Sequence, residues 1–144
     1  MRLEGIIAFA CHKHTDQLDK VGEPYILHPI RVMLSMSTPT ERAVAILHDV
    51  LEDTNADVQS LRDVGCPETV VDAVIAITKV KGESYKDYLL RVSKNKIAVK
   101  VKRADISDNA SPIRLYKMTP EKRIELRNKY NTAINILDSL EELE

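Results

Sequence analysis

The chain is poor in the residues that build β-sheets and disulfide frameworks. It has no tryptophan, one phenylalanine and two cysteines, Cys11 and Cys66, in 144 residues. Two cysteines are too few for a disulfide framework and are typical of thiols in a reducing cytosol. The scarcity of aromatic residues and of alternating apolar and polar positions argues against strands. We therefore expect an all-α protein located in the cytoplasm.

The chain also lacks an excess of charge of one sign and a long apolar run. Twenty-one basic and 22 acidic residues give a formal net charge of −1, so there is no electrostatic reason to expect a nucleic acid or a membrane as a partner. The apolar run at residues 6–11 is too short for a transmembrane helix, and no signal peptide is recognisable. We expect one domain, residues 1–144, with a substantial core.

Helix signals are dense. Apolar residues recur at helical spacing, and capping residues and prolines mark helix starts. The segment 97–109 also fits a short strand, but Ala98, Val101 and Asp105 share one helical face, which favours a helix. The last helix has an apolar stripe that faces its own core or a partner, so a homo-oligomer is possible. Helices are expected over residues 3–14, 29–36 and 97–109. Another begins at Thr40 and continues through 48–54, and the next runs from a cap at Thr54 or Asn55 to Val64. Three more are expected to begin at Pro67, at Ser84 and at Thr119-Pro120.

Four ionisable side chains follow directly on the buried-type apolar run at residues 43–47. His48 and Glu52 are spaced i,i+4, as are Asp49 and Asp53, so each pair shares a helical face. A histidine with a carboxylate suits a divalent metal, and the second acidic pair suits acid–base chemistry. The alternative is a solvated helix end, which is disfavoured because acidic residues at a helix C-terminus oppose the helix dipole.

Other ligands must come from elsewhere, since two ligands from one helix rarely fill a metal site. His14, at the end of the first helix, and Asp105, on the expected core face of 97–109, are candidates. His12 and His28 compete with them, although His28 precedes a proline and suits a turn-stabilising hydrogen bond. A zinc site at Cys11 and His14 would lack the second pair found in closed structural sites.

Four segments in this order resemble the HD superfamily of metal-dependent phosphohydrolases. The fuller similarity is to the hydrolase domain of the RelA/SpoT alarmone enzymes and to the small stand-alone alarmone hydrolases. A lone His-Asp dipeptide would be weak support, whereas four segments at near-family spacing are specific. These segments are His14-Thr15-Asp16-Gln17, Gly22-Glu23-Pro24-Tyr25-Ile26-Leu27-His28-Pro29, His48-Asp49-Val50-Leu51-Glu52-Asp53-Thr54, and Val101-Lys102-Arg103-Ala104-Asp105 leading to Asn109.

The resemblance implies an HD-type helical bundle that hydrolyses a nucleotide. It implies Mn²⁺ as the cofactor, with Fe²⁺, Co²⁺ or Ni²⁺ able to take its place, and an acidic pair, Glu52 and Asp53, that orients or activates the attacking water. Tyr25 and His28 match a segment that shapes the floor of the site, and Asn109 matches a nucleoside contact. The implied metal ligands are His14, His48, Asp49 and Asp105, and further substrate contacts are expected at Lys20, Arg127 and Tyr130.

The substrate implied by the resemblance is (p)ppGpp, from which a 3′-pyrophosphate would be removed. One position departs from the family: Asp19, followed by the matching Lys20, stands where an arginine can stack on guanine, and an acid cannot make that stack. Two alternatives therefore stay open. One is an HD-type hydrolase of another nucleotide or phosphoester, and the other is a non-catalytic nucleotide sensor, which has no need for Glu52 and Asp53.

Overall fold

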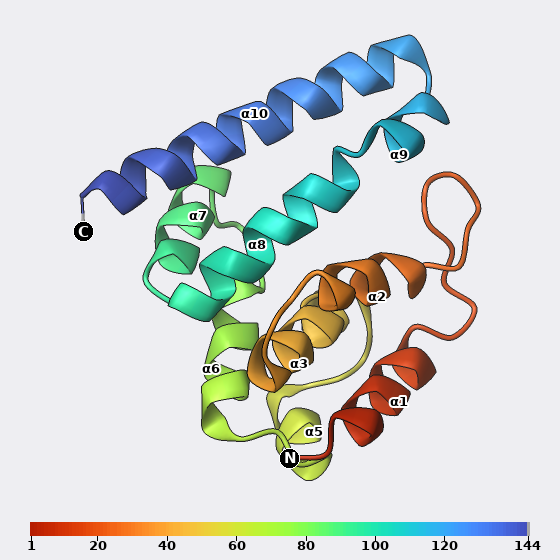
Figure 1. Ribbon diagram of the computed structural model, residues 1–144, viewed down its shortest axis with the longest axis vertical. Coiled ribbons are helices and arrows are strands. Elements are labelled where there is room, and N and C mark those ends of the chain that lie inside the picture. Colours follow the sequence, from red (N-terminus) through yellow and green to blue (C-terminus); the bar gives the residue numbers. More distant parts are fainter. Residues whose placement is uncertain (144) are drawn as a thin grey trace.

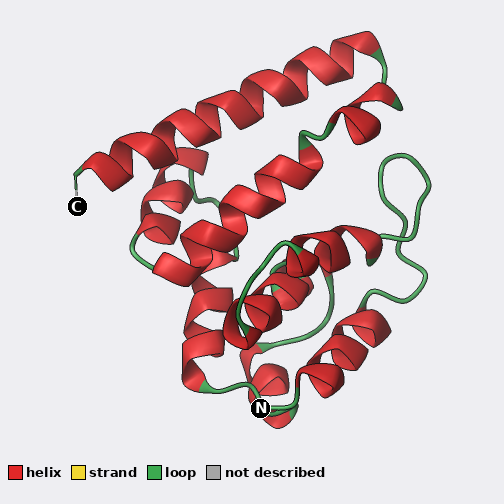
Figure 2. Cartoon of the chain, viewed as in Figure 1, coloured by secondary structure: helices red, strands yellow, loops and turns green. Residues whose placement is uncertain are grey.

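The computed structural model describes residues 1–143, and this part of the chain folds into ten α-helices without a sheet (Figures 1 and 2). A single isolated bridge joins Leu18 to Pro24 in the loop after the first helix. The all-α prediction is confirmed. The helices are α1 (Leu3–Lys13), α2 (Leu27–Leu34), α3 (Pro39–Leu47), α4 (Val50–Asp53), α5 (Val58–Asp63), α6 (Glu68–Ile77), α7 (Tyr85–Ser93), α8 (Lys96–Asn109), α9 (Pro112–Tyr116) and α10 (Pro120–Glu142).

Helix α3 lies at the centre of the core. Its residues 43–47 are fully buried, and the helix packs against α1, α2, α6 and α8. The helix begins one residue earlier than expected, because Thr38 forms a capping box with Glu41 and Pro39 occupies the first turn. Because α3 is held on several sides, the residues at its end are presented at a fixed place.

The helix is interrupted at His48 and Asp49, so the expected continuous helix through residue 54 is wrong. Helix α3 ends at Leu47, and the short α4 starts at Val50. Asp49, between them, has φ −107° and ψ 0°, outside the helical region. The break places His48 and Asp49 in a turn, where His48 Nε2 and Asp49 Oδ2 lie 3.0 Å apart although the residues are adjacent in the chain.

The start of the next helix also differs from the prediction. Asp57, rather than Thr54 or Asn55, caps α5 by accepting a hydrogen bond from the backbone N–H of Ser60 at 2.8 Å. Thr54 instead donates its hydroxyl to the carbonyl of Val50 and accepts the N–H of Ala56. Thr54 thus closes α4 and does not open α5, because its hydroxyl reaches back by one turn.

In the C-terminal half of the chain, α7, α8 and α10 pack against one another. The segment 97–109 lies within the helix α8, as expected, and α10 runs along α7 and α8 (Figure 1). The stripe on α10 packs on this chain's own core, with Leu126, Ala133 and Leu137 buried and Tyr130 and Leu140 half-buried. No helix within residues 1–143 is long and apolar enough to cross a bilayer.

Candidate metal centre and active site

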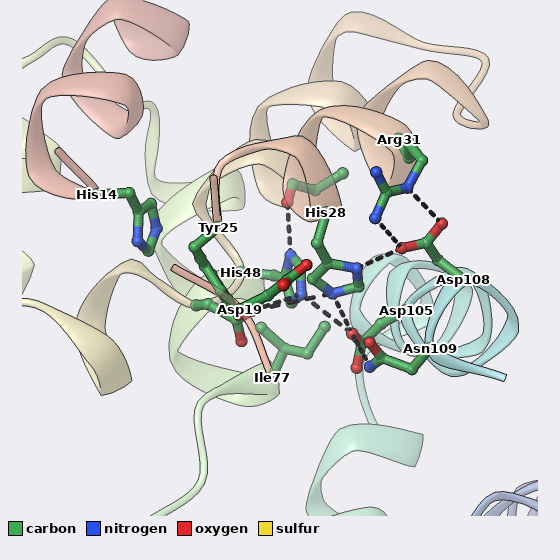
Figure 3. Close-up of polar contacts among 12 residues, drawn as sticks. His14, Asp19, Tyr25, His28, Arg31, His48, Ile77, Asp105, Asp108 and Asn109 are labelled. Atoms are coloured by element: carbon green, nitrogen blue, oxygen red, sulfur yellow. Dashed lines mark hydrogen bonds and ion pairs between the residues drawn. The ribbon is translucent and has the colours of Figure 1, made fainter. Parts of the chain in front are cut away.

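Three separate parts of the fold bring two imidazoles and two carboxylates together. His28 comes from α2, His48 and Asp49 from the turn between α3 and α4, and Asp105 from α8. Asp105 Oδ1 lies 2.8 Å from His28 Nε2 and 3.3 Å from His48 Nε2. Asp49 Oδ2 lies 3.0 Å from His48 Nε2 and 4.0 Å from His28 Nε2. Figure 3 shows both rings directed toward this common point. We call these four residues the metal cluster.

The donor atoms of the metal cluster fit a divalent cation. The Nδ1 atoms of both rings are occupied, that of His28 by Asp108 Oδ2 at 2.6 Å and that of His48 by the carbonyl of Ala45 at 2.7 Å. If each Nδ1 carries the proton, each Nε2 turns a lone pair toward carboxylate oxygens. Ligands bound at about 2.1 Å in perpendicular directions are about 3 Å apart, which matches three of the four separations; the fourth, between His28 Nε2 and Asp49 Oδ2, is longer at 4.0 Å. Within residues 1–143, His28, His48 and Asp49 are the group whose ligand atoms lie close enough together to hold one ion.

The carboxylates of the metal cluster shift the pKa of both imidazoles. Burial disfavours the charged form of His48, but the charges of Asp49 and Asp105 outweigh burial and hold the pKa of His48 well above its usual value. Burial likewise opposes the charged form of His28, and its hydrogen bonds to Asp105 and Asp108 raise the pKa of that ring. A cluster that attracts protons in this way also attracts a metal ion.

His14, expected as a ligand, lies outside the metal cluster. Its ring is buried at the end of α1, and Nδ1 is 2.8 Å from Gln17 Oε1. The ring of Tyr25 stands 5.1 Å from that of His14 and separates it from His28 (Figure 3). The Nε2 atom of His14 is buried without a hydrogen-bond partner in the described part of the chain. The structure thus brings His48, Asp49 and Asp105 together as expected, but joins them to His28.

The acidic pair lies beside the metal cluster, at the edge of a cavity. Glu52 Oε1 accepts the backbone N–H of Lys79 at 3.0 Å. Burial, followed by the charges of Asp49 and Glu52, raises the pKa of Asp53. The Tyr25 hydroxyl donates to Asp49 Oδ2, the same oxygen that lies 3.0 Å from His48 Nε2, and so helps to fix that carboxylate. A carboxyl group with a raised pKa beside a metal site is suited to proton transfer.

A cavity of about 410 Å³ opens directly on the metal cluster. Four of the five expected substrate contacts, Lys20, Tyr25, Asn109 and Tyr130, line it, whereas Arg127 is exposed on α10 outside the lining. Sequence reasoning missed Arg114 and Lys129, both of which line the cavity. The one-turn spacing of Lys129 from the buried Leu126 was the available signal for its position.

Asp19 is held by its own loop and does not project freely. Its Oδ1 accepts the backbone N–H groups of Val21 and Glu23 at 2.9 and 3.0 Å, and its side chain is only 7% exposed. Its Oδ2 lies 3.5 Å from Arg114, which also binds Asp108 at 3.0 Å. The acid at this position therefore shapes the loop and faces a guanidinium, which offsets its charge toward an anionic ligand.

Searches for similar proteins agree with this fold and site. No protein-family model matches the chain. It is 30% identical over 128 residues, 81% of its length, to a guanosine-3′,5′-bis(diphosphate) 3′-pyrophosphohydrolase of Aquifex aeolicus (strain VF5), and spans 18% of that protein. It is 31% identical over 129 residues to a probable enzyme of the same name from Synechocystis sp. (strain ATCC 27184 / PCC 6803 / Kazusa), covering 80% of the chain and 17% of that protein.

The similarity extends to a protein named GTP pyrophosphokinase and to a solved structure. A GTP pyrophosphokinase of Streptomyces coelicolor (strain ATCC BAA-471 / A3(2) / M145) is 30% identical over 122 residues, which are 76% of this chain and 14% of that protein. A solved structure of a metazoan ortholog of SpoT, described as hydrolysing ppGpp, superposes with a TM-score of 0.78 at 24% identity, covering 94% of this chain and 84% of that one.

The helical fold and the histidine–aspartate cluster define an HD-type domain. Together with the sequence similarities they identify the chain more particularly as a RelA/SpoT-like HD domain. The chain spans less than a fifth of the length of these curated relatives.

Proposed function

We propose that this domain is a metal-dependent hydrolase that removes pyrophosphate from the 3′ position of a (p)ppGpp-like nucleotide. The observation that carries the proposal is the metal cluster at the floor of a 410 Å³ cavity that is flanked by a second acidic pair. The relatives named as 3′-pyrophosphohydrolases supply the substrate class.

The metal ligands in this proposal are His28, His48, Asp49 and Asp105. Two imidazole nitrogens and two carboxylate oxygens form a mixed donor set that suits Mn²⁺ or Fe²⁺, and also Co²⁺ or Ni²⁺. When bound, such an ion lowers the pKa of water and neutralises charge that develops on the phosphoryl group. Asp108 and the Ala45 carbonyl hold the two rings in the required orientation through their Nδ1 atoms.

The chain's own acid–base groups are Glu52 and Asp53. The bond of Glu52 to the Lys79 backbone fixes one carboxylate, so this residue is suited to orient the attacking water. Asp53, with its raised pKa, is suited to accept the proton of that water and to return a proton to the leaving oxygen. Lys20 and Asn109 line the same cavity and are placed to contact the nucleotide.

Release of pyrophosphate from ppGpp with and without Mn²⁺ tests the function directly. We expect turnover that requires the ion and that is abolished in His28→Ala and His48→Ala. His14→Ala should retain a metal-bound, active enzyme, because His14 lies behind Tyr25. If His14→Ala loses the metal and His28→Ala keeps it, the assignment of His28 as a ligand is wrong and the sequence-based expectation of His14 is right.

A panel of dNTPs, NADPH and phosphomonoesters distinguishes the second candidate, a hydrolase of another nucleotide. Asp19 is the residue that motivates this alternative, since it stands where the alarmone hydrolases carry an arginine. Turnover of one of these compounds, with none of ppGpp, would replace the alarmone proposal. Nucleotide binding without any metal-dependent turnover would instead indicate a sensor.

A further inference from the structure

Arg114, on the short helix α9, reaches the cavity from outside the segments that carry the sequence motifs. It lines the 410 Å³ cavity together with Asp19 and Asn109, and its side chain is only 14% exposed. Burying a guanidinium is costly unless its N–H groups have partners. The partners that Arg114 has therefore determine which part of the group remains for a ligand.

Neighbouring side chains occupy the N–H edge of this guanidinium. Its Nη1 donates to Asp108 Oδ2 and to Asn109 Oδ1, both at 3.0 Å, which uses both hydrogens of that nitrogen. Its Nη2 lies 3.5 Å from Asp19 Oδ2. A phosphate binds arginine in the plane of the group, through paired N–H bonds. The existing contacts obstruct that approach between Nη1 and Nη2, whereas the flat faces of the group carry no hydrogen bonds.

The wall of the cavity beside Arg114 includes apolar side chains. Leu18 adjoins Asp19 in the chain, Met118 follows Arg114 by four residues, and both line the cavity. Leu18 is 62% exposed, so its side chain is accessible to a ligand. A flat heterocycle suits this place, because its π face attracts a cation and its carbon atoms leave water on contact with apolar side chains.

Arg114 is close to the metal cluster without belonging to it. Its Nη1 lies 3.2 Å from Nδ1 of His28, whereas Nε2 of the same ring faces the cluster carboxylate Asp105. One imidazole ring thus separates the guanidinium from the proposed position of the ion. In a nucleotide, one sugar ring separates a 3′-phosphate from the base. A nucleotide with its 3′-phosphate at the metal cluster can therefore bring its base to Arg114.

We propose that Arg114 holds the base of the nucleotide by stacking its guanidinium plane on the ring, with Leu18 and Met118 as the apolar wall beside it. This base contact rests on the proposed function and makes Arg114 a specificity-determining residue. It also explains how the cavity tolerates an acid at position 19. The guanidinium comes from α9 instead of from that loop, and Asp19 lies at its edge, where a carboxylate does not block the stacking face.

The decisive variant is Arg114→Lys, which keeps a positive charge beside Asp108 and removes the plane that stacks. Arg31→Lys is the matched control, because Arg31 also binds Asp108, at 2.8 Å, but is not among the described residues that line the cavity. We expect Arg114→Lys to raise the KM for ppGpp roughly ten-fold with kcat nearly unchanged. Arg31→Lys should leave the KM at its wild-type value.

Calorimetry on the Mn²⁺-loaded protein separates stacking from charge. GDP and inorganic pyrophosphate both carry a diphosphate, but only GDP carries a base. Arg114→Lys should weaken GDP binding roughly ten-fold and leave pyrophosphate binding unchanged. Leu18→Ala changes an exposed side chain, so the fold is kept, and it should weaken GDP binding roughly three-fold through lost apolar contact. Equal weakening of both probes by Arg114→Lys, or unchanged GDP binding in both variants, would overturn the base contact.

Two further readouts distinguish this contact from the proposed function and from a structural role. If wild type does not hydrolyse ppGpp, the proposed function fails, but a selective loss of GDP binding in Arg114→Lys would still support the base contact. The affinity for Mn²⁺ should be the same in Arg114→Lys, Arg31→Lys and wild type. Weaker Mn²⁺ binding in Arg114→Lys alone would mean that Arg114 acts through Asp108 and His28, and the assignment to the base would be wrong.

Discussion

At the scale of single residues, the metal cluster is a place where protons and a cation compete. The carboxylates around His28 and His48 raise the pKa of both rings above about 6.5, the ordinary value. A bound divalent ion requires both Nε2 atoms to be unprotonated. We therefore expect the apparent affinity for Mn²⁺ to fall as the pH is lowered from about 8 to about 6, with protons released on binding.

Calorimetry in buffers of different ionisation enthalpy measures that proton release. The same pKa shifts stabilise the metal-free protein at low pH, because a raised imidazole pKa contributes stability below about 6.5 that is lost as the pH rises through the folded-state value. An affinity for Mn²⁺ that does not change over this range would show that the imidazoles are not ligands.

The acidic pair is testable without disturbing the shape of the site. Glu52→Gln and Asp53→Asn remove charge and keep volume, so each should lower kcat by about 10²-fold or more while the metal stays bound. Stopped assays of kcat, with metal content measured on the same samples, separate the two effects. Wild-type turnover in both variants would reduce Glu52 and Asp53 to surface charges.

Asp19 is predicted to act on its loop. Asp19→Asn keeps an oxygen for the N–H groups of Val21 and Glu23, so we expect stability and KM close to wild type. Asp19→Ala removes that oxygen and should cost about 1 kcal/mol of the free energy of unfolding, measured by urea denaturation. If the asparagine variant is as damaged as the alanine variant, the charge of Asp19 matters more than its hydrogen bonds.

At the scale of helices, Arg91 fastens the segment that carries Lys79. Its guanidinium donates to the carbonyls of Ile75, Ala76 and Thr78 at the end of α6 and pairs with Glu83 at 2.9 Å. That pairing lowers the pKa of Glu83 to about 2. The stability that this pair provides is present above about pH 4.5 and is lost as the pH falls from there toward 2.

Arg91→Lys should therefore lower the melting temperature and flatten its dependence on acid pH, because an ammonium cannot serve the carbonyls and the carboxylate together. Thermal unfolding between about pH 5 and pH 3 measures this slope. A variant with the same acid slope as wild type would show that Glu83 has no special partner in solution.

Local sequence signals predicted the helices well and their boundaries less well. Ser84 and Thr119 cap helices as expected, because a cap acts within one turn of the chain and is visible in the sequence. Thr38 caps α3, which was expected to start at Thr40. The break at His48 and Asp49 was not predicted. The i,i+4 spacing there fitted an unbroken helix equally well, and nothing local distinguishes the turn.

At the scale of the whole molecule, the chain positions of the metal-cluster residues explain which of them the sequence revealed. His48 and Asp49 stand out locally as charges after an apolar run. The partnership of His28 with Asp105 spans 77 positions, and it depends on how α2 packs against α8, which periodicity does not show. For the same reason the sequence placed His28 in a turn, and only the assembled fold directs its ring to the metal cluster.

Metal binding should raise the stability of the whole domain. At about 100 times its Kd, an ion that binds only the folded state adds about 2.7 kcal/mol, which corresponds to a rise of roughly 5–10 °C in Tm for a domain of this size. Differential scanning calorimetry with Mn²⁺ and with EDTA measures the rise. The control His12→Ala, at an exposed position, should show the same rise in Tm. If wild type shows no rise in Tm with Mn²⁺, the protein has no native metal site.

The wide separation of the metal-cluster residues along the chain has a kinetic consequence. A site that joins residue 28 to residue 105 exists only after α8 has docked on α2, and we expect this long-range contact to form after the folding transition state. Ion binding should then leave the refolding rate almost unchanged and slow unfolding instead. The ion would bind only after the fold has formed, and its loss would raise the unfolding rate and shorten the lifetime of the native state.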